Sequence, residues 1–293
     1  MSLLPEAARA AVEAAAGAPV VRVTPLGGGC VATVIKADLA DGGAVVAKVG
    51  ASGAAADGGA LAVEAFMLGW LRGRGLSPVP AVLHGTDDLL VMEWIDGAAG
   101  TPSPEAARDL ADVAAAWHEV TAEQFGFARD TVIAALPQPN AEADDWRDFF
   151  RDRRLLHMAG AAHAAGRLPA ATLRRIERLA GRLDAWDLGG TRPSLVHGDL
   201  WGGNVLSRGG RIVGLIDPAI YFADAEIELA FMTLFGTVGD AFFDRYAEHR
   251  PLRPGFFEVR RDLYNLYPLL VHVRLFGGHY VGQVERILAR FAG

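Results

Sequence analysis

The pattern of apolar residues changes near residue 100, and this change restricts the possible folds more than any other feature of the chain. Residues 20–96 carry short apolar runs separated by turn residues, a pattern that predicts antiparallel strands. From residue 105 onward, apolar residues recur mainly at helical spacing. The sequence therefore predicts an α+β fold with two lobes. We expect a small antiparallel-sheet lobe at 1–96, a Gly- and Pro-containing hinge at 97–104, and a large, mainly helical lobe at 105–293.

The expected elements can be placed by residue number. In the first lobe we expect helices at 1–18 and 61–72, and strands at 20–23, 31–37, 44–49, 81–84 and 89–94. The turn Asp41-Gly42-Gly43 marks a hairpin between two of these strands. In the second lobe we expect helices at 105–118 and 173–186, two short strands at 195–206 and 212–217 that flank a loop, and helices again through 226–291. Residues 51–60 are mostly Gly and Ala and indicate a loop.

Composition and charge exclude several classes of function. The formal net charge is −7 at pH 7, whereas a protein that binds nucleic-acid backbones needs an excess of Lys and Arg. The best candidate for a membrane span, Leu263–Phe276, is interrupted by polar residues and by Pro268. The first residues lack the basic and apolar regions of a signal peptide. We therefore expect neither nucleic-acid nor membrane partners.

Cys30 is the only cysteine in the chain, so no internal disulfide can form. A single cysteine suits a reducing compartment, and we expect a cytoplasmic protein. The sequence leaves open whether the chain is a monomer or a homodimer.

The segment from His197 to Asn204 is the most informative one for chemistry. An apolar run leads into His197-Gly198-Asp199, and Asn204 follows Asp199 after five positions, which is the spacing of a kinase catalytic loop. In such a loop the aspartate accepts the proton of the attacking hydroxyl, and the asparagine offers a neutral oxygen to a hard cation. Asp217 ends another apolar run, where a carboxylate can hold magnesium on the phosphates of ATP. Both aspartates could instead be turn or cap residues, but their combined spacing argues against this.

The first lobe contains the other parts expected of an ATP site. Lys48 lies within an apolar strand, where a lone charge needs a partner, and Glu64 on the next expected helix is a suitable one. The lysine would then contact the α- and β-phosphates. Gly27-Gly28-Gly29 would cover the phosphates, although position 32 is Ala rather than the third glycine of G-x-G-x-x-G. The backbone of Met92-Glu93-Trp94-Ile95 would meet adenine, or these side chains simply pack between the lobes.

Other enzyme classes lack their motifs in this chain. No G-x-x-x-x-G-K-[ST], G-x-S-x-G or H-E-x-x-H occurs, and the eight histidines show no paired metal-ligand spacing. His197 is expected to support the catalytic loop by hydrogen bonding, with direct contact to substrate as the alternative.

The sequence resembles the fructosamine/ketosamine-3-kinase family, relatives of the aminoglycoside phosphotransferases with a protein-kinase-like fold. The His-Gly-Asp…Asn…Asp core is shared with aminoglycoside and choline kinases, so further segments carry the resemblance from Gly27 onward. These segments are Trp201 after the catalytic aspartate, Asp217-Pro218-Ala219 with Tyr221 and Glu226–Ala230, Leu234-Phe235-Gly236, Phe125-Gly126-Phe127, Leu136–Asn140, Asp145–Arg153, Tyr264–His272 and Leu275-Phe276-Gly277.

The resemblance implies phosphorylation of the O3 hydroxyl of a ketosamine, with ATP and Mg²⁺ as cofactors. The resulting 3-phosphate is unstable and frees the amine, so such an enzyme deglycates small amines or proteins. Ribulosamines and erythrulosamines are expected in preference to fructosamines. Carried over to this chain, Asp199 is the base, and Asn204 and Asp217 bind the metal. Trp201 would form a flat wall for the sugar, or pack under the loop.

The resemblance also draws attention to Cys30, since the family often has a cysteine in the glycine-rich loop. An exposed thiol there could be oxidised or bridge two chains and block the nucleotide site, or it could be a small packing residue. Ala134-Ala135 stands where the family tends to have threonine before Pro-Gln, and this difference leaves the substrate preference open.

Two other functions compete with this interpretation. Another small-molecule kinase, such as an aminoglycoside phosphotransferase, would take a polycationic acceptor, but Trp201 and Asp217-Pro218-Ala219 argue against it. A pseudokinase would bind nucleotide without transferring phosphate. Lys48, Asp199 and Asp217 are all present, so a pseudokinase is the less favoured alternative.

Overall fold

The computed structural model describes residues 3–27, 32–50 and 59–291. The chain divides into two compact units, each of which is built from several segments. The first unit comprises residues 1–109, 131–137 and 202–219, and the second comprises residues 110–130, 138–201 and 220–293. Helix α3 (Pro104–His118) begins in the first unit and ends in the second.

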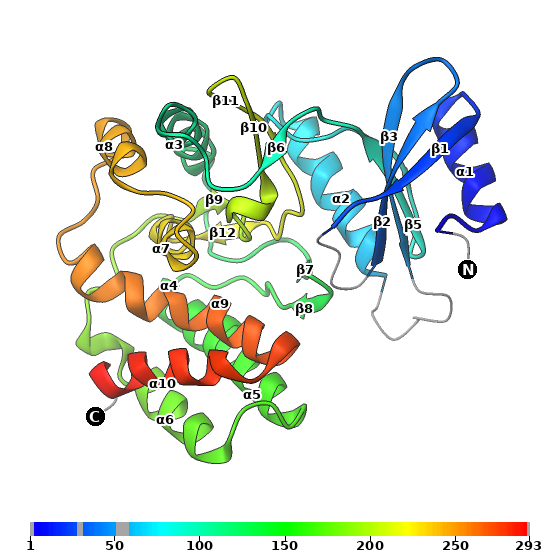
Figure 1. Cartoon of the computed structure of the whole chain (residues 1–293). Coiled ribbons are helices and arrows are strands. Elements are labelled where there is room, and N and C mark those ends of the chain that lie inside the picture. The colour runs from blue at the N-terminus through cyan, green and yellow to red at the C-terminus, as the bar shows by residue number, and fades with distance from the viewer. Residues whose placement is uncertain (1–2, 28–31, 51–58, 292–293) are drawn as a thin grey trace. The chain divides into compact units, whose positions relative to one another are not determined.

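An antiparallel sheet forms the main part of the first unit (Figure 1). Within the described residues it has the order β1-β2-β3-β5-β4. Its strands are β1 (Val20–Pro25), β2 (Ala32–Leu39), β3 (Ala44–Gly50), β4 (Val82–Gly85) and β5 (Leu89–Glu93). The β2–β3 hairpin pairs Asp38 with Ala44, so the turn lies where Asp41-Gly42-Gly43 predicts it.

Two helices pack against this sheet on its opposite faces. Helix α1 (Glu6–Ala16) covers the face formed by alternate residues of the strands, including Ile35, Ala37 and Ala47. Helix α2 (Ala60–Gly73) contacts β4 and β5, and its buried side chains include Met67, Leu68 and Leu71. Because side chains alternate along a strand, the neighbours of Ala47 point toward α2 rather than α1.

The remaining segments of the first unit form smaller sheets. Strands β10 (Val205–Arg208) and β11 (Arg211–Leu215) make a hairpin, and β6 (Ala98–Ala99) pairs with β10 on its other side. A 3₁₀ turn, η4 (Gly202–Asn204), leads directly into β10. Strands β7 (Thr131–Ile133) and β8 (Leu136–Gln138) pair with each other.

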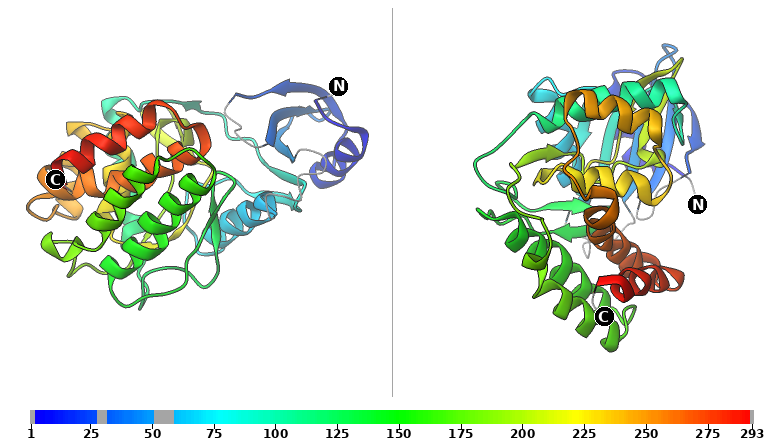
Figure 2. Two further views of the ribbon diagram at one scale, coloured as in Figure 1. Left: turned by 90° about the horizontal axis from the view of Figure 1, so that it is seen from below. Right: turned by 90° about the vertical axis from the view of Figure 1, so that its left-hand side faces the viewer.

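Helices make up most of the second unit. They are α4 (Trp146–Phe149), the π-helical η2 (Phe150–Leu156), α5 (His157–Ala164), α6 (Ala170–Ala180), the 3₁₀ turn η3 (Leu183–Ala185), α7 (Glu226–Leu234), α8 (Asp240–His249), the π-helical η5 (Phe256–Arg260), α9 (Arg261–Phe276) and α10 (His279–Phe291). Strands β9 (Ser194–Val196) and β12 (Tyr221–Ala223) pair antiparallel. Helix α7 is buried along most of its length and packs on α9, while α9 and α10 lie side by side (Figure 2).

The expected combination of a small antiparallel sheet with a mainly helical remainder is confirmed, with differences in detail. The helix expected at 173–186 ends at Ala180, and a 3₁₀ turn follows Gly181. The run 195–206 is not one strand: β9 ends at Val196 and β10 begins at Val205. Among the described residues, no helix has the length and apolar character needed to cross a membrane.

Candidate active site

Lys48 brings together two carboxylates of the first unit. It lies in β3 between Ala47 and Val49 and points toward α2, where a lone ammonium group would otherwise meet an apolar surface. Its Nζ donates to Glu64 Oε1 on α2 at 2.7 Å and to Asp217 Oδ1 at 2.5 Å. The Lys48 side chain is only 9% exposed. The expected pairing of Lys48 with Glu64 is confirmed, and the contact with Asp217 joins positions 169 residues apart.

The charges of this cluster determine its protonation. Burial alone lowers the pKa of the Lys48 amine, but the charges of Glu64 and Asp217 outweigh burial and raise the pKa above its ordinary value. The amine therefore remains a cation. Burial raises the pKa of Glu64, attraction to Lys48 opposes this, and repulsion from Asp217 adds to it. A cation held by two carboxylates can exchange one of them for a phosphate oxygen.

Asn204 and Asp217 lie at the same end of the β10–β11 hairpin. The backbone N–H of Ile216 donates to the carbonyl of Asn204 at 3.1 Å. The pairing of β10 with β11 therefore continues as far as Ile216, the residue before Asp217. Asp217 itself has a φ of 55°, a left-handed conformation that costs a residue with a side chain about 1–3 kcal/mol. Its side chain is 38% exposed. Such a strained, accessible carboxylate is suited to holding a cation.

The possible ligands at this end of the hairpin fit magnesium better than a metal whose ligands all come from the protein. Within the described parts of the chain, no group of three or more His, Cys, Asp or Glu side chains could hold a metal ion. Magnesium is commonly held by one or two carboxylates together with substrate phosphates and water. Asp217 offers a carboxylate and Asn204 an amide oxygen, and both are ligand types that magnesium accepts.

Asp199 lies in the second unit, in the loop that follows β9. Gly198 precedes it with a φ of 84°, which favours glycine because that residue has no Cβ. The backbone N–H of Gly198 donates to Glu228 Oε2 at 2.8 Å, and the N–H of Trp201 donates to the Asp199 carbonyl at 3.2 Å. His197 is fully buried, and its ring lies 5.9 Å from that of Trp117. The loop therefore has a defined backbone conformation.

A buried chain of hydrogen bonds reaches this loop from helices α3, α7 and α8. Glu228 on α7 bonds to His118 Nε2 through its second oxygen at 2.9 Å, and His118 Nδ1 lies 2.7 Å from the Tyr246 hydroxyl. All three side chains are buried. Glu228, His118 and Tyr246 were not recognised from the sequence as residues that support the loop. The available signal was a glutamate inside the otherwise apolar run 227–232, because a buried charge requires partners.

Trp201 begins a cluster of aromatic side chains in the second unit. It is 40% exposed and meets Phe235 edge-on, with ring centroids 6.2 Å apart. Phe235 in turn lies 4.9 Å from the ring of His272 on α9. Burial and the nearby His279 lower the pKa of His272, while a bond to the Pro268 carbonyl opposes them. Of these three aromatic residues, the sequence suggested a role in the site only for Trp201. Contacts between helices that are far apart in the chain leave no recognisable spacing in the sequence.

The other predicted nucleotide residues lie in the first unit. Met92 is buried in β5, and the Glu93 carboxylate accepts the backbone N–H of Ala81 at 3.1 Å. Lys36 Nζ lies 4.6 Å from the centre of the Trp94 ring. The fourth hinge residue, Ile95, follows Trp94 on the way to β6, and Gly27 follows β1. Gly28, Gly29 and Cys30 lie outside the described residues.

Known proteins resemble this chain along almost its whole length. The family model described as fructosamine kinase matches residues 8–292. A probable ketoamine kinase from Synechocystis is 38% identical over 216 residues, covering 71% of this chain and 70% of the relative. A protein-ribulosamine 3-kinase, chloroplastic, from Arabidopsis thaliana is 31% identical over 203 residues, covering 68% and 60% respectively.

Solved structures agree with this relationship. A crystal structure from Thermobifida fusca, described as a fructosamine-3-kinase, is 36% identical with a TM-score of 0.84 and covers 96% of this chain and 98% of that one. An aminoglycoside phosphotransferase is 18% identical with a TM-score of 0.68, covers 97% and 99%, and shows a shared fold alone. The two-lobed, kinase-like fold expected from the sequence is thereby confirmed. The chain belongs to the fructosamine kinase family and is a phosphotransferase enzyme.

Proposed function

We propose that this enzyme transfers the γ-phosphoryl group of ATP to the O3 hydroxyl of a ketosamine, in a magnesium-dependent reaction. The observation that carries the nucleotide part is the contact of Lys48 with both Glu64 and Asp217. This arrangement fits a phosphate-binding lysine beside a metal-binding carboxylate. The ketosamine part is supported by the family match and by the relatives named ketoamine kinase and protein-ribulosamine 3-kinase.

Each proposed catalytic residue has a distinct role. Lys48 would neutralise charge on the α- and β-phosphates, held in place by Glu64. Asn204 and Asp217 would hold magnesium, which supplies positive charge against the phosphates when it is bound. Asp199 would accept the proton of the sugar hydroxyl as its oxygen bonds to the γ-phosphorus and ADP leaves.

Other residues would position the nucleotide and the acceptor. The backbone at residues 92–95 would contact adenine, and Gly27, Gly28 and Gly29 would cover the phosphates. Trp201 would present its exposed ring to the sugar, and His197 would support the loop from its buried position. We further propose that ribulosamines and erythrulosamines are preferred to fructosamines. The 3-phosphate product would then decompose and free the amine, which deglycates the carrier.

The test is ADP release from magnesium-ATP with ribulosyl-lysine, fructosyl-lysine or kanamycin as the acceptor. We expect turnover with the two ketosamines and none after Asp199→Asn. Turnover with kanamycin alone would instead make the chain an aminoglycoside phosphotransferase. ATP binding without turnover on any of the acceptors would contradict the proposed reaction. Omitting magnesium, or adding a chelator, should abolish ADP release.

A further inference from the structure

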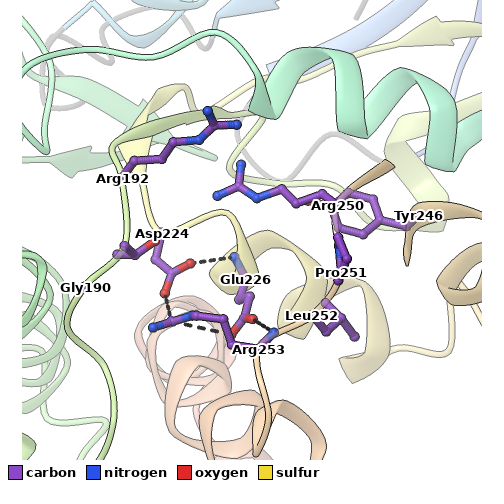
Figure 3. A pocket seen from close by; sticks show the side chains of 10 residues that line it. Gly190, Arg192, Asp224, Glu226, Tyr246, Arg250, Pro251, Leu252 and Arg253 are labelled. Atoms are coloured by element: carbon purple, nitrogen blue, oxygen red, sulfur yellow. Dashed lines mark hydrogen bonds and ion pairs between the residues drawn. The ribbon is translucent and has the colours of Figure 1, made fainter. Parts of the chain in front are cut away.

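A pocket of about 240 Å³ opens in the second unit (Figure 3), and none of residues 197–204 lines it. It is bordered by residues 190–192 before β9, by the start of α7, and by residues 250–253 after α8. Pockets for drug-sized ligands measure about 300–1,000 Å³. This pocket therefore suits a small ion or metabolite.

The charges on one side of the pocket are already paired. Arg253 Nη2 donates to Asp224 Oδ2 at 2.6 Å and lies 3.6 Å from Glu226 Oε2. Glu226 also accepts hydrogen bonds from the buried Arg260. Two carboxylates thus face two guanidinium groups, and this part of the lining offers little net charge to a ligand.

Arg192 and Arg250 form the other side, and their guanidinium groups approach each other from opposite directions (Figure 3). Arg250 Nη1 donates to Ser194 Oγ at 2.9 Å and to the His118 carbonyl at 3.1 Å. Arg192 donates through Nη2 to the exposed carboxylate of Glu119. A guanidinium has five N–H donors, so these bonds within the described residues leave several donors on each arginine for a ligand.

We propose that this pocket binds a small oxyanion, with phosphate or carboxylate oxygens held between Arg192 and Arg250. Guanidinium groups bind such oxygens through paired, charge-assisted hydrogen bonds. An anion there also relieves the repulsion between two like charges. The Glu119 carboxylate neutralises part of the positive charge of the two arginines from the solvent side. Its bond to Arg192 and the charge of Arg250 lower the pKa of Glu119. Glu119 is thus a competitor of the ligand.

The same pocket is connected to the segment that carries Asp199. Arg250 contacts the hydroxyl of Ser194, which is the first residue of β9. His197 follows directly after the last residue of this strand. His118, whose carbonyl Arg250 also contacts, bonds through its side chain to Glu228, which holds the Gly198 N–H. An oxyanion on Arg250 would therefore act on the position of the catalytic loop. This consequence for turnover rests on the proposed function, whereas the binding itself does not.

Calorimetric titration of nucleotide-free enzyme with inorganic phosphate and with malonate, at constant ionic strength, tests the site. Arg192→Gln and Arg250→Gln should each weaken binding about tenfold, the loss expected for a charge-assisted hydrogen bond. Glu119→Gln should strengthen binding, because it removes the competing carboxylate. Arg208→Gln is the matched control: this exposed arginine pairs with Asp96 in the first unit, and its loss should change nothing.

Each outcome decides part of the proposal. Failure of the wild type to bind either anion, or equal binding by Arg192→Gln and the wild type, would overturn the site. Arg192 is 49% exposed, so its variant should fold even if Arg250→Gln does not. In the ADP-release assay, phosphate should change kcat of the wild type, and Arg192→Gln should need about ten times more phosphate for the same change. An unchanged wild-type kcat with the pocket filled would overturn the connection to the loop. Absence of all turnover would contradict the proposed reaction and leave the titration result standing.

Discussion

Glu228 Oε2 accepts the backbone N–H of Gly198 at 2.8 Å, one residue before Asp199. The other carboxylate oxygen of Glu228 bonds to His118 Nε2, so both oxygens are engaged in a fully buried setting. A carboxylate on α7 thus fixes the backbone of the loop that carries the proposed base. We expect Glu228 to act as a positioning residue, because it would affect Asp199 only through the chain.

Glu228→Gln should lower kcat while leaving KM for ATP unchanged. A glutamine amide has only one oxygen, so its NH₂ group would face either the Gly198 N–H or His118 Nε2. Loss of a charged hydrogen bond costs about 1.5–3 kcal/mol. If that loss falls on the loop, kcat should drop about tenfold to a hundredfold. Steady-state ADP release measures this, with the exposed Glu123→Gln as a control. Equal kcat in Glu228→Gln and the wild type would show that the loop does not depend on this bond.

Lys48→Met should abolish turnover and also destabilise the first unit. Removing one partner of a buried ion pair typically costs about 3–5 kcal/mol, because the other charge is left without compensation. The double variant Lys48→Met/Glu64→Gln removes that charge, so it should recover much of the lost stability without recovering activity. Urea unfolding and ADP release together check this. A double variant less stable than Lys48→Met would refute the assigned ion pair.

Trp201→Ala should raise KM for the ketosamine about three- to tenfold, the effect expected from a lost aromatic contact. The free energy of unfolding should change little, since the ring is 40% exposed. Phe257→Ala is a suitable control, because Phe257 is an exposed aromatic of the second unit on η5. Initial rates at varied ketosamine and fixed ATP provide the measurement. An effect on KM for ATP alone would argue against an acceptor role.

His272 makes stability depend on pH in a defined direction. Burial lowers its pKa in the folded state, so the unfolded chain binds the proton more readily. Its contribution to stability is therefore complete above the unfolded pKa of about 6.5 and is lost as pH falls toward the folded value. Denaturant unfolding at pH 7.5 and 5.5 should show a larger loss for the wild type than for His272→Gln. An NMR titration of the His272 ring should give a midpoint below 6.5.

Local patterns predicted the five-stranded sheet and its two helices well. Strand β3 and helix α2 lie within one residue of the positions expected at 44–49 and 61–72. Lys48 was recognisable because a charge inside an apolar strand requires a partner, and Glu64 was the nearest suitable one. The third member, Asp217, was predicted only as a metal ligand, and its contact with Lys48 links distant positions and has no local signature.

The second unit shows where sequence reasoning stops. Strand β12 (Tyr221–Ala223) went unrecognised, because its three residues form a strand only by pairing with β9. The π-helical segments η2 and η5 resemble ordinary helix in their apolar spacing. Arg192 and Arg250 are 58 positions apart, and only the folded chain brings both to one pocket. The role of a residue can thus be predicted from the sequence when its contacts are local or when its spacing follows a known motif.

The hydrogen-bond chain through Glu228 has a consequence for the order of folding. It joins residues 118, 198, 228 and 246, so the catalytic loop reaches its final conformation only after contacts of long sequence separation have formed. Such contacts require large loops to close and therefore form slowly compared with helices. During refolding, the far-ultraviolet circular dichroism of the helices should recover before enzymatic activity does. A newly made chain would then hold most of its secondary structure before it can transfer phosphate.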